Sequence, residues 1–525
     1  MGHSPFVTAL AERQSDPAER DWLYVPYDQL TDRLGPLATE DPSTLGIVLV
    51  ESTAKASLRP YHKQKLALIL ANMRQFALEQ AQRGVAVRHV VTGDCYAKAL
   101  APIATEVGRL RCMVPAEREL RADLKPLAQR GAIEWIPHGG WLTTRTQFDA
   151  SHPRGAPWRM DRFYRRVRQD SGILMEQGSP TGGKYSFDAD NRRAWKGEPA
   201  APVPPRMQPD AVTEEVLELI ATRFADHPGQ LDGDSLPATA ADAARLWQWA
   251  RAECLRDFGP YQDAMSTESS SLFHTRISAL LHLHRLLPVD VLADVLEMDI
   301  PLASKEGFVR QILGWREFVH HVHDATDGLR RLPNAAAQDE PNHLDMHGAL
   351  PPAFWGKQSG LACLDRVIAD VWREGYGHHI SRLMVLSNLA TLLDVSPREL
   401  TDWFWVAYTD AFDWVVEPNV LGMGTFAVGD LMTTKPYVAG SAYIDRMSDY
   451  CGSCAFNPKK DCPIRSLYWA FFERHRATLQ GNPRLAVPLA SSAKRSADQQ
   501  QADRSVFERV GRELRAGRMV RPDDR

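Results

Sequence analysis

Three cysteines near the C-terminal end have a spacing that suits metal chemistry. Two residues separate Cys451 from Cys454, and seven more separate Cys454 from Cys462, which Pro463 follows. The Cys-x2-Cys spacing lets two thiolates turn towards one centre, and four soft ligands suit either tetrahedral zinc or an iron–sulfur cluster. A fourth ligand must come from elsewhere, and Cys363 is the best-placed candidate. The spacing alone leaves zinc and iron–sulfur open.

The cysteine count and the composition limit the class of protein. The chain has seven cysteines, an odd number, and residues 1–16 contain no positive region followed by an apolar stretch. We therefore expect a cytoplasmic protein without a disulfide framework. The sequence contains no run of about 18 apolar residues, so we expect no membrane helix. The net charge of −4 argues against a general nucleic-acid coat protein but leaves room for a local basic face.

The first third of the chain alternates short apolar runs with helical patterns. Strands are expected at residues 22–25, 46–51, 85–91, 110–115 and 132–137, with a long helix at 62–83. This order predicts an α/β domain over residues 1–137, built on a doubly wound parallel sheet. Such sheets bind ligands at the carboxyl ends of their strands. No glycine fingerprint or P-loop is present, so an ordinary dinucleotide site is not supported.

The rest of the chain divides into three parts. Residues 138–210 are rich in Gly, Pro and Arg and predict a linker with one basic helix at 159–168. Residues 211–488 show helical spacing with polar caps and predict an all-α domain. Residues 489–525 are rich in Ser, Gln, Asp and Arg, and predict a mobile tail with one helix at 505–517.

Short motifs run in order along residues 20–480. They include Asp28-Gln29-Leu30, Phe163-Tyr164-Arg165, Gly314-Trp315-Arg316-Glu317-Phe318, His378-His379-Ile380-Ser381-Arg382 and Asp449-Tyr450-Cys451. Together they resemble the iron–sulfur bacterial cryptochromes and photolyases. The resemblance implies an N-terminal α/β antenna domain and an all-α C-terminal domain that binds FAD. It also implies a four-iron four-sulfur cluster held by Cys363, Cys451, Cys454 and Cys462, and so favours iron–sulfur over zinc.

The resemblance assigns residues to the flavin and to its reduction. A pyrophosphate-binding turn is implied at His274, Thr275, Arg276, Ile277 and Ser278. Other flavin neighbours would be Trp315, Arg316 and Glu317, and an ion pair beside the isoalloxazine would form between Arg382 and Asp410. The electron-hopping aromatics would be Trp403 and Trp355. The position after Trp403 is often aromatic and oxidisable in the family, but here it is Phe404, which is hard to oxidise.

The adjacent histidines His378 and His379 resemble the pair used by family members that repair the (6-4) photoproduct. That repair needs proton transfer as well as an electron, and histidine can serve as acid or base near neutral pH. Other residues that resemble the family's lesion pocket are Asp263, Met423, Tyr437 and Tyr443. An unpaired, distorted lesion costs less to flip from the duplex than a normal base.

A basic stripe in the linker would contact DNA phosphates. It comprises Arg162 and Arg165 together with Arg159, Arg166 and Arg168, interleaved with Phe163 and Tyr164.

Three positions depart from the family pattern. Tyr27 replaces a glycine beside the antenna site, which puts the usual ribityllumazine chromophore in question, although Glu51 remains at the end of the second strand. Val416 stands where an acidic residue often lies near the flavin N5 atom, and a valine cannot exchange a proton. Ser266 stands where the family often has tryptophan.

The leading prediction is a monomeric, light-driven enzyme that repairs the (6-4) photoproduct in UV-damaged DNA. The first alternative is a blue-light photoreceptor of the same fold that does not repair DNA. A photolyase for cyclobutane pyrimidine dimers is a variant of the leading prediction. A third class is a light-independent iron–sulfur nucleic-acid-binding protein, similar in its helical domain to the primase large subunit.

Overall fold

Five parallel strands form the core of the N-terminal domain. The computed structural model describes residues 4–333 and 340–522. The sheet has the order β3-β2-β1-β4-β5, with strands β1 (Asp21–Tyr24), β2 (Leu45–Ser52), β3 (Ala86–Thr92), β4 (Leu110–Met113) and β5 (Ile133–Ile136). Strand β1 is central; β2 and β3 extend the sheet on one side of it, and β4 and β5 extend it on the other. The predicted doubly wound α/β domain is confirmed.

The strand sequences explain why this sheet is central. All eight residues of β2 are buried, as expected for a parallel strand covered on both faces. Gly46 pairs with Trp22 in the register of β1 and β2. A Cβ atom at Gly46 would lie 2.7 Å from the Trp22 ring, so only glycine lets the indole cover this strand. The flanking helices are α1 (Pro5–Ala11), α3 (Thr53–Ser57), α4 (Lys63–Gln82), α5 (Tyr96–Val107) and α6 (Arg118–Gln129).

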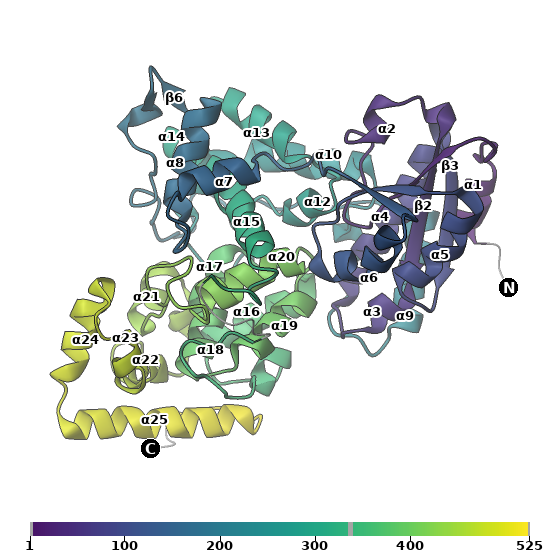
Figure 1. Cartoon of the computed structure of the whole chain (residues 1–525). Helices are drawn as coiled ribbons and strands as arrows, with labels where there is room; N and C mark the ends of the chain where they lie inside the picture. Colours follow the sequence, from purple (N-terminus) through teal and green to yellow (C-terminus); the bar gives the residue numbers. More distant parts are fainter. Residues whose placement is uncertain (1–3, 334–339, 523–525) are drawn as a thin grey trace.

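The segment predicted as a linker is largely structured. It contains α7 (Arg145–Ser151), α8 (Met160–Ser171) and a two-stranded hairpin of β6 (Met175–Glu176) and β7 (Ser179–Pro180). Helices α7 and α8 pack on the helical domain, whereas the next helix, α9 (Ala211–Arg223), packs on α1 and α4 of the α/β domain. The chain therefore crosses between the two domains more than once, and residue 210 is not a spatial boundary (Figure 1).

The C-terminal domain is helical, as predicted. Its helices are α10 (Ala240–Trp249), α11 (Leu255–Tyr261), α12 (Ser278–His282), α13 (Pro288–Glu297), α14 (Leu302–Val309), α15 (Glu317–Ala325), α16 (Ala362–Glu374), α17 (His379–Ser381), α18 (Asn388–Leu392), α19 (Pro397–Ala407), α20 (Asp413–Val416), α21 (Ser441–Met447) and α22 (Pro463–Arg474). None of the helices in the described part of the chain is long and apolar enough to cross a membrane.

Three helical runs widen into π-turns at the predicted site residues. These turns are η5 (Arg310–Arg316), η7 (Arg382–Ser387) and η8 (Glu417–Gly424). A π-turn inserts a residue into the helix and re-aims the side chains around it, and such turns are frequent at functional sites. Their positions therefore mark the centre of the helical domain as the place to examine for chemistry.

The C-terminal tail is not the mobile segment predicted from its composition. Helix α24 (Ala486–Ala493) leads into α25 (Ala497–Arg515), which packs along α22 (Figure 1). Val510 and Leu514 of α25 are buried. Although the segment is mostly polar, α25 has a narrow apolar stripe. This stripe is enough to pack the helix against one side of the protein.

We expect Leu514→Ala to destabilise the protein by about 2–5 kcal/mol, because it removes a buried side chain and leaves a cavity. Chemical unfolding of the full chain measures the change. Glu508→Ala, at an exposed position of the same helix, is the control and should have little effect. Equal stability of the two variants would contradict the packed tail.

Candidate active site

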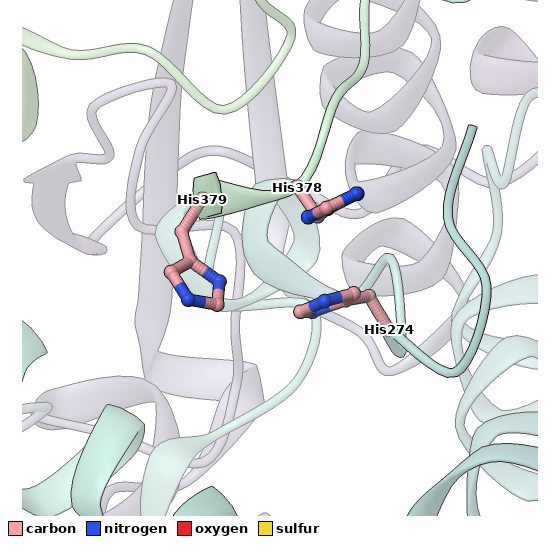
Figure 2. Close-up of side chains that lie close together, drawn as sticks. All are labelled: His274, His378 and His379. Atoms are coloured by element: carbon pink, nitrogen blue, oxygen red, sulfur yellow. The ribbon is translucent and has the colours of Figure 1, made fainter. Parts of the chain in front are cut away.

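Three histidines meet in the helical domain. His378 and His379 lie at the start of α17, and His274 comes from the loop that precedes α12. Their ligating nitrogen atoms all lie within 4.8 Å of one another (Figure 2). The His274 and His378 rings are stacked, with centroids 4.4 Å apart, and His379 meets His274 edge-on at 5.3 Å. Such a group can relay protons, and its spacing would also accommodate a metal ion.

The three rings differ in their capacity to carry a proton. Burial, followed by the neighbouring histidines, holds the pKa of both His274 and His378 well below 6.5, so both rings are neutral at neutral pH. The His379 side chain is 44% exposed, and its Nε2 atom lies 3.7 Å from a carboxylate oxygen of Asp263. This contact becomes an ion pair when His379 is protonated. His379 is therefore the ring of this group that is suited to carry a proton.

Charged and phenolic groups lie around Asp263, the carboxylate beside His379, and around its neighbour Arg192. Arg192 lies 3.9 Å from Asp263 and also pairs with Asp188. Burial and then the Asp263 charge raise the pKa of Tyr443, while burial and then Asp188 raise that of Tyr437. Both tyrosines therefore keep their protons at neutral pH and can donate hydrogen bonds.

The structure thus brings Tyr443 close to Asp263, and Tyr437 close to Asp188 and Arg192. Their roles in a lesion pocket stay predictions. The structure adds Arg192, for which the sequence predicted no role. Met423 lies on the π-turn η8 and is half-buried.

The predicted Arg382–Asp410 pair is present. Two guanidinium nitrogens of Arg382 each lie 2.9 Å from an Asp410 oxygen. Although burial alone would raise the pKa of Asp410, Arg382 holds it below the ordinary value. The Ser278 hydroxyl also donates to Asp410, at 2.7 Å. This fork-to-fork geometry fixes both side chains in one orientation.

The unpaired donors of Arg316 show whether the residues of the helical domain fit a flavin nucleotide. It is buried against the Trp141 and Trp414 rings and donates one hydrogen bond, to Glu317. Its Nε and Nη2 atoms are buried and have no hydrogen-bond partner. Buried donors that lack an acceptor are costly, and they suit an anionic group such as a phosphate. The residues present therefore fit a phosphate-bearing cofactor.

Several residues predicted to contact the flavin have partners within the protein. His274 stacks on His378. Arg276 donates to Glu374 at 2.7 Å. The buried Glu317 carboxylate accepts hydrogen bonds from Leu142 and Thr143, so it anchors the linker.

The expected roles of the remaining turn residues stay predictions. Thr275 and Ile277 are buried, and Trp315 is half-buried on η5.

The predicted electron-hopping residues differ in exposure. Trp403 is buried on α19, whereas Trp355 is 45% exposed. A third indole, Trp372, lies between them on α16, with ring centroids 6.0 Å from Trp403 and 5.6 Å from Trp355. No sequence motif marked Trp372, because its place depends on how α16 packs against α19.

The four predicted ligand cysteines line one cavity. Cys363 comes from α16, Cys451 and Cys454 from the loop after α21, and Cys462 from the start of α22. Burial raises the pKa of the Cys462 thiol to about 12 and that of Cys451 to about 11. Metal ligands must be deprotonated. At neutral pH these thiols would therefore become thiolates only on binding a metal cation.

A second cavity lies between the two domains, where the resemblance implies an antenna. Tyr27 lines it, donates a hydrogen bond from its hydroxyl to Glu117 and stacks on Phe412 with ring centroids 6.4 Å apart. The Glu51 carboxylate is held by Arg74, at 2.8 and 3.0 Å, and by His89 at 2.9 Å. Glu51 is therefore engaged by the protein itself, and Tyr27 takes up room in the cavity.

The basic stripe of α8 is narrower than predicted. Arg162 and Arg165 are exposed. Arg168 is buried and donates to the carbonyl groups of Ile173 and Tyr185, so it holds the linker together. The two aromatic residues of the stripe, Phe163 and Tyr164, are buried and face the core.

Comparison with known proteins agrees with the fold. Residues 23–236 match the family described as "Deoxyribodipyrimidine photo-lyase-related protein". A (6-4) photolyase of Agrobacterium fabrum (strain C58 / ATCC 33970) is 33% identical over 496 residues, which cover 90% of this chain and 95% of that protein. The chain therefore belongs to the photolyase family of light-driven, flavin-dependent DNA-repair enzymes.

A solved structure shows the same fold. The crystal structure of a bacterial class III photolyase from Agrobacterium tumefaciens matches with a TM-score of 0.55 and 13% identity, covering 95% of this chain and 99% of that one.

We expect Glu51→Gln to lower the free energy of unfolding at pH 7 by about 3 kcal/mol. Burial would raise the pKa of Glu51, but His89 and Arg74 lower it from 4.5 to about 2. A carboxyl whose pKa is lowered on folding contributes stability above its unfolded pKa. The contribution disappears as the pH falls from about 4.5 to about 2.

Chemical unfolding over a pH series measures this difference. Glu106→Gln removes an exposed pair with Arg88 and should change little at any pH. A pH-independent loss for Glu51→Gln would show that the pair contributes through packing and not through charge.

Proposed function

We propose that the protein repairs the (6-4) photoproduct in UV-damaged DNA. The observation that carries this proposal is the histidine group, in which one exposed ring faces a carboxylate and two buried rings are neutral. The relative that is 33% identical bears the name "(6-4) photolyase", which supports the same substrate. When bound, reduced FAD supplies the light-driven electron.

The chemistry of the lesion explains why histidines are needed. Repair must move a hydroxyl group between two bases, so a proton has to be given and taken back. In the proposed mechanism His379 donates that proton, and Asp263 stabilises the protonated ring. His378, neutral and held against His274, accepts a hydrogen bond from the lesion. Splitting a cyclobutane dimer has no comparable need, which favours the (6-4) lesion.

The flavin would be held by two sets of residues. Arg382 and Asp410 would lie beside its ring system, and the unused donors of Arg316 would bind its phosphates. The DNA would contact Arg162, Arg165 and Arg192, which are exposed. Phosphate contacts of this kind give salt-dependent affinity without sequence preference. The protein would act on DNA as a monomer in the cytoplasm.

Two further groups belong to the proposal. A four-iron four-sulfur cluster would bind to Cys363, Cys451, Cys454 and Cys462, because these four line one cavity and this donor set suits iron–sulfur ligation. It would tie α22 to α16 and so have a structural role. A ribityllumazine-type antenna would occupy the interdomain cavity, in which Tyr27 restricts the space.

A second candidate function is a blue-light photoreceptor without repair. Val416 is buried on α20, at the position expected near the flavin N5 atom. The neighbouring Glu417 carboxylate cannot take that place, because it binds His323, Arg330 and Arg398. Without an acidic group near N5, a different flavin redox state could persist and serve as a signal.

The deciding experiment is photorepair of a short single-stranded oligonucleotide that carries one defined (6-4) lesion. The protein is reduced beforehand, and the products are separated by chromatography after blue light, with a dark control. We expect light-dependent recovery of the two normal bases. A flavin-bound, photoreducible protein that recovers none would favour the photoreceptor or a cyclobutane-specific enzyme, and a cyclobutane-dimer oligonucleotide distinguishes these.

We expect His379→Ala to slow (6-4) repair by about 100-fold or more, in the range of a lost general acid, with flavin content unchanged. His347→Ala, which alters an exposed histidine paired with Asp345, is the control. Unchanged repair by His379→Ala would remove this residue from the mechanism.

We expect Cys454→Ser to lose bound iron and much of its soluble yield, because metal binding and folding are coupled. Iron determination and absorption spectra of the purified protein measure the loss. Cys95→Ser, which changes a cysteine in the α/β domain, should retain iron. Normal iron content in Cys454→Ser would rule out this ligand.

A further inference from the structure

We propose that Asp449 is a positioning residue for DNA repair. Its carboxylate anchors the irregular segment that carries Asp263, and so holds Asp263 beside His379. The proposal rests on the proposed proton transfer by His379, and it adds a residue from another part of the chain on which that transfer depends. It also gives a role to Ser266, at which the chain departs from the family pattern.

Asp263 lies in a part of the helical domain that has no regular structure. Residues 262–277 join α11 to α12 through turns and bends, without a helix or a strand. No ladder of backbone hydrogen bonds fixes this segment, so its conformation depends on contacts with other parts of the protein. A loop of this length in a compact domain is usually functional. The position of Asp263 is therefore set by the contacts of the residues next to it.

The turn that follows α21 holds the next part of this segment. The Met265 N–H donates to the Met447 carbonyl at 2.9 Å. The Asp449 carboxylate accepts from the Ser266 hydroxyl at 2.9 Å, and from the N–H and the hydroxyl of Thr267 at 2.8 and 2.9 Å. Hydrogen bonds to a carboxylate are about twice as strong as those between neutral groups. One side chain therefore fixes two neighbouring residues of the segment.

Serine at position 266 makes this contact possible. The Ser266 side chain is buried, and its hydroxyl donates to Asp449 while it accepts from the Glu268 N–H at 3.1 Å. An indole has one donor, on its ring, and no acceptor, so a tryptophan at this position would not make both bonds. The departure from the family pattern therefore goes with a different means of holding the segment.

The anchor belongs to the wall of the cysteine cavity. Ser441 and Ile444 of α21 line this cavity. Tyr450, which directly follows Asp449, lines it too and is buried. The Ser441 hydroxyl also donates to the Pro458 carbonyl at 2.6 Å. These contacts place Asp449 on a packed element, so it can act as a fixed point for the irregular segment.

The contacts of Asp263 itself are weaker than this anchor. Arg192 lies 3.9 Å from Asp263, but its side chain is 57% exposed, and an exposed pair at this distance contributes little. Tyr443 of α21 also lies close enough for the Asp263 charge to raise its pKa, after burial. Asp449 is exposed as well, but it makes three short hydrogen bonds to one stretch of chain. The segment therefore depends mainly on Asp449.

The consequence for repair is positional. The Nε2 atom of His379 lies 3.7 Å from an Asp263 oxygen, and this carboxylate stabilises the protonated ring. A shift of the segment would take that support away without removing any group that reacts. Misplacement of a catalytic group by about 1 Å can cost roughly 100-fold in rate. Asp449 thus acts on the proton donor through the segment and not on the reacting atoms.

The test measures (6-4) repair by the pre-reduced holoprotein and by its Asp449→Ala variant. The readout is the number of lesions repaired per absorbed photon, with the single-stranded oligonucleotide at saturation. We expect Asp449→Ala to lower this yield by about tenfold or more, with flavin and iron contents unchanged. Asp41→Ala is the control, since Asp41 is an exposed aspartate that accepts a backbone N–H in the α/β domain, and it should repair normally.

The conservative variant Asp449→Asn should retain most of the yield. Its amide oxygen can accept from the Thr267 N–H, and its NH2 group can donate to the two hydroxyls. Ser266→Ala changes the other partner and leaves the cysteine loop intact. We expect it to lower the yield by about threefold, in the range of one lost hydrogen bond, so the test remains decisive even if Asp449→Ala loses iron.

A double variant shows whether Asp449 acts through His379. Asp449→Ala combined with His379→Ala should repair no more slowly than His379→Ala alone, because a positioning residue has no effect once the group that it positions is gone. Unchanged yield in Asp449→Ala, unchanged yield in Ser266→Ala, or a further loss in the double variant would overturn the proposal.

Hydrogen exchange in the dark separates this proposal from the proposed function. The N–H groups of Met265 and Thr267 are donors in the anchor. The peptide that contains them should therefore exchange about tenfold faster in Asp449→Ala than in the unaltered protein. If the unaltered protein repairs no lesion, the proposed function fails, and exchange still shows whether Asp449 holds the segment. If it repairs the lesion and Asp449→Ala changes neither yield nor exchange, the positioning proposal fails alone.

Discussion

The ion pair between Arg382 and Asp410 is the interaction on which the geometry of the site depends. Its bidentate contact joins the π-turn η7 to the segment that follows α19. The Nε atom of Arg382 also donates to the Gly377 carbonyl, directly before the histidine pair, at 2.6 Å. Burying two charges is costly unless both are satisfied, and here Ser278 completes the set of partners. One pair therefore orients both the residues proposed to hold the flavin and the histidine pair.

The same constraint extends to the domain junction through α19 and α4. The His62 N–H donates to the Val406 carbonyl at 2.8 Å, and the Lys65 ammonium donates to the Trp405 carbonyl at 2.8 Å. Burial lowers the pKa of Lys65 to about 7. Helix α19 thus presents Trp403 to the helical core and Trp405 to the interdomain cavity.

Some of this arrangement was predictable because it rests on local signals. The strands follow from short β-branched runs, and the grouping of Cys451, Cys454 and Cys462 follows from their spacing. The tail was misjudged because its apolar stripe is narrow and its composition is polar. Arg168 and Glu317 were assigned to partners outside the protein, because a sequence does not show which charged residues become buried and bind backbone groups instead.

The sequence by itself determined the fold class, the cluster of three cysteines and the histidine pair, because periodicity, spacing and adjacency are properties of the chain. Only the tertiary structure decided that His274 joins that pair, that Arg192 lies beside Asp263, and that Trp372 stands between Trp403 and Trp355. These contacts link segments far apart in the chain. Their physical basis is the packing of α16, α17 and α19 around the buried Arg382–Asp410 pair, which no local pattern encodes.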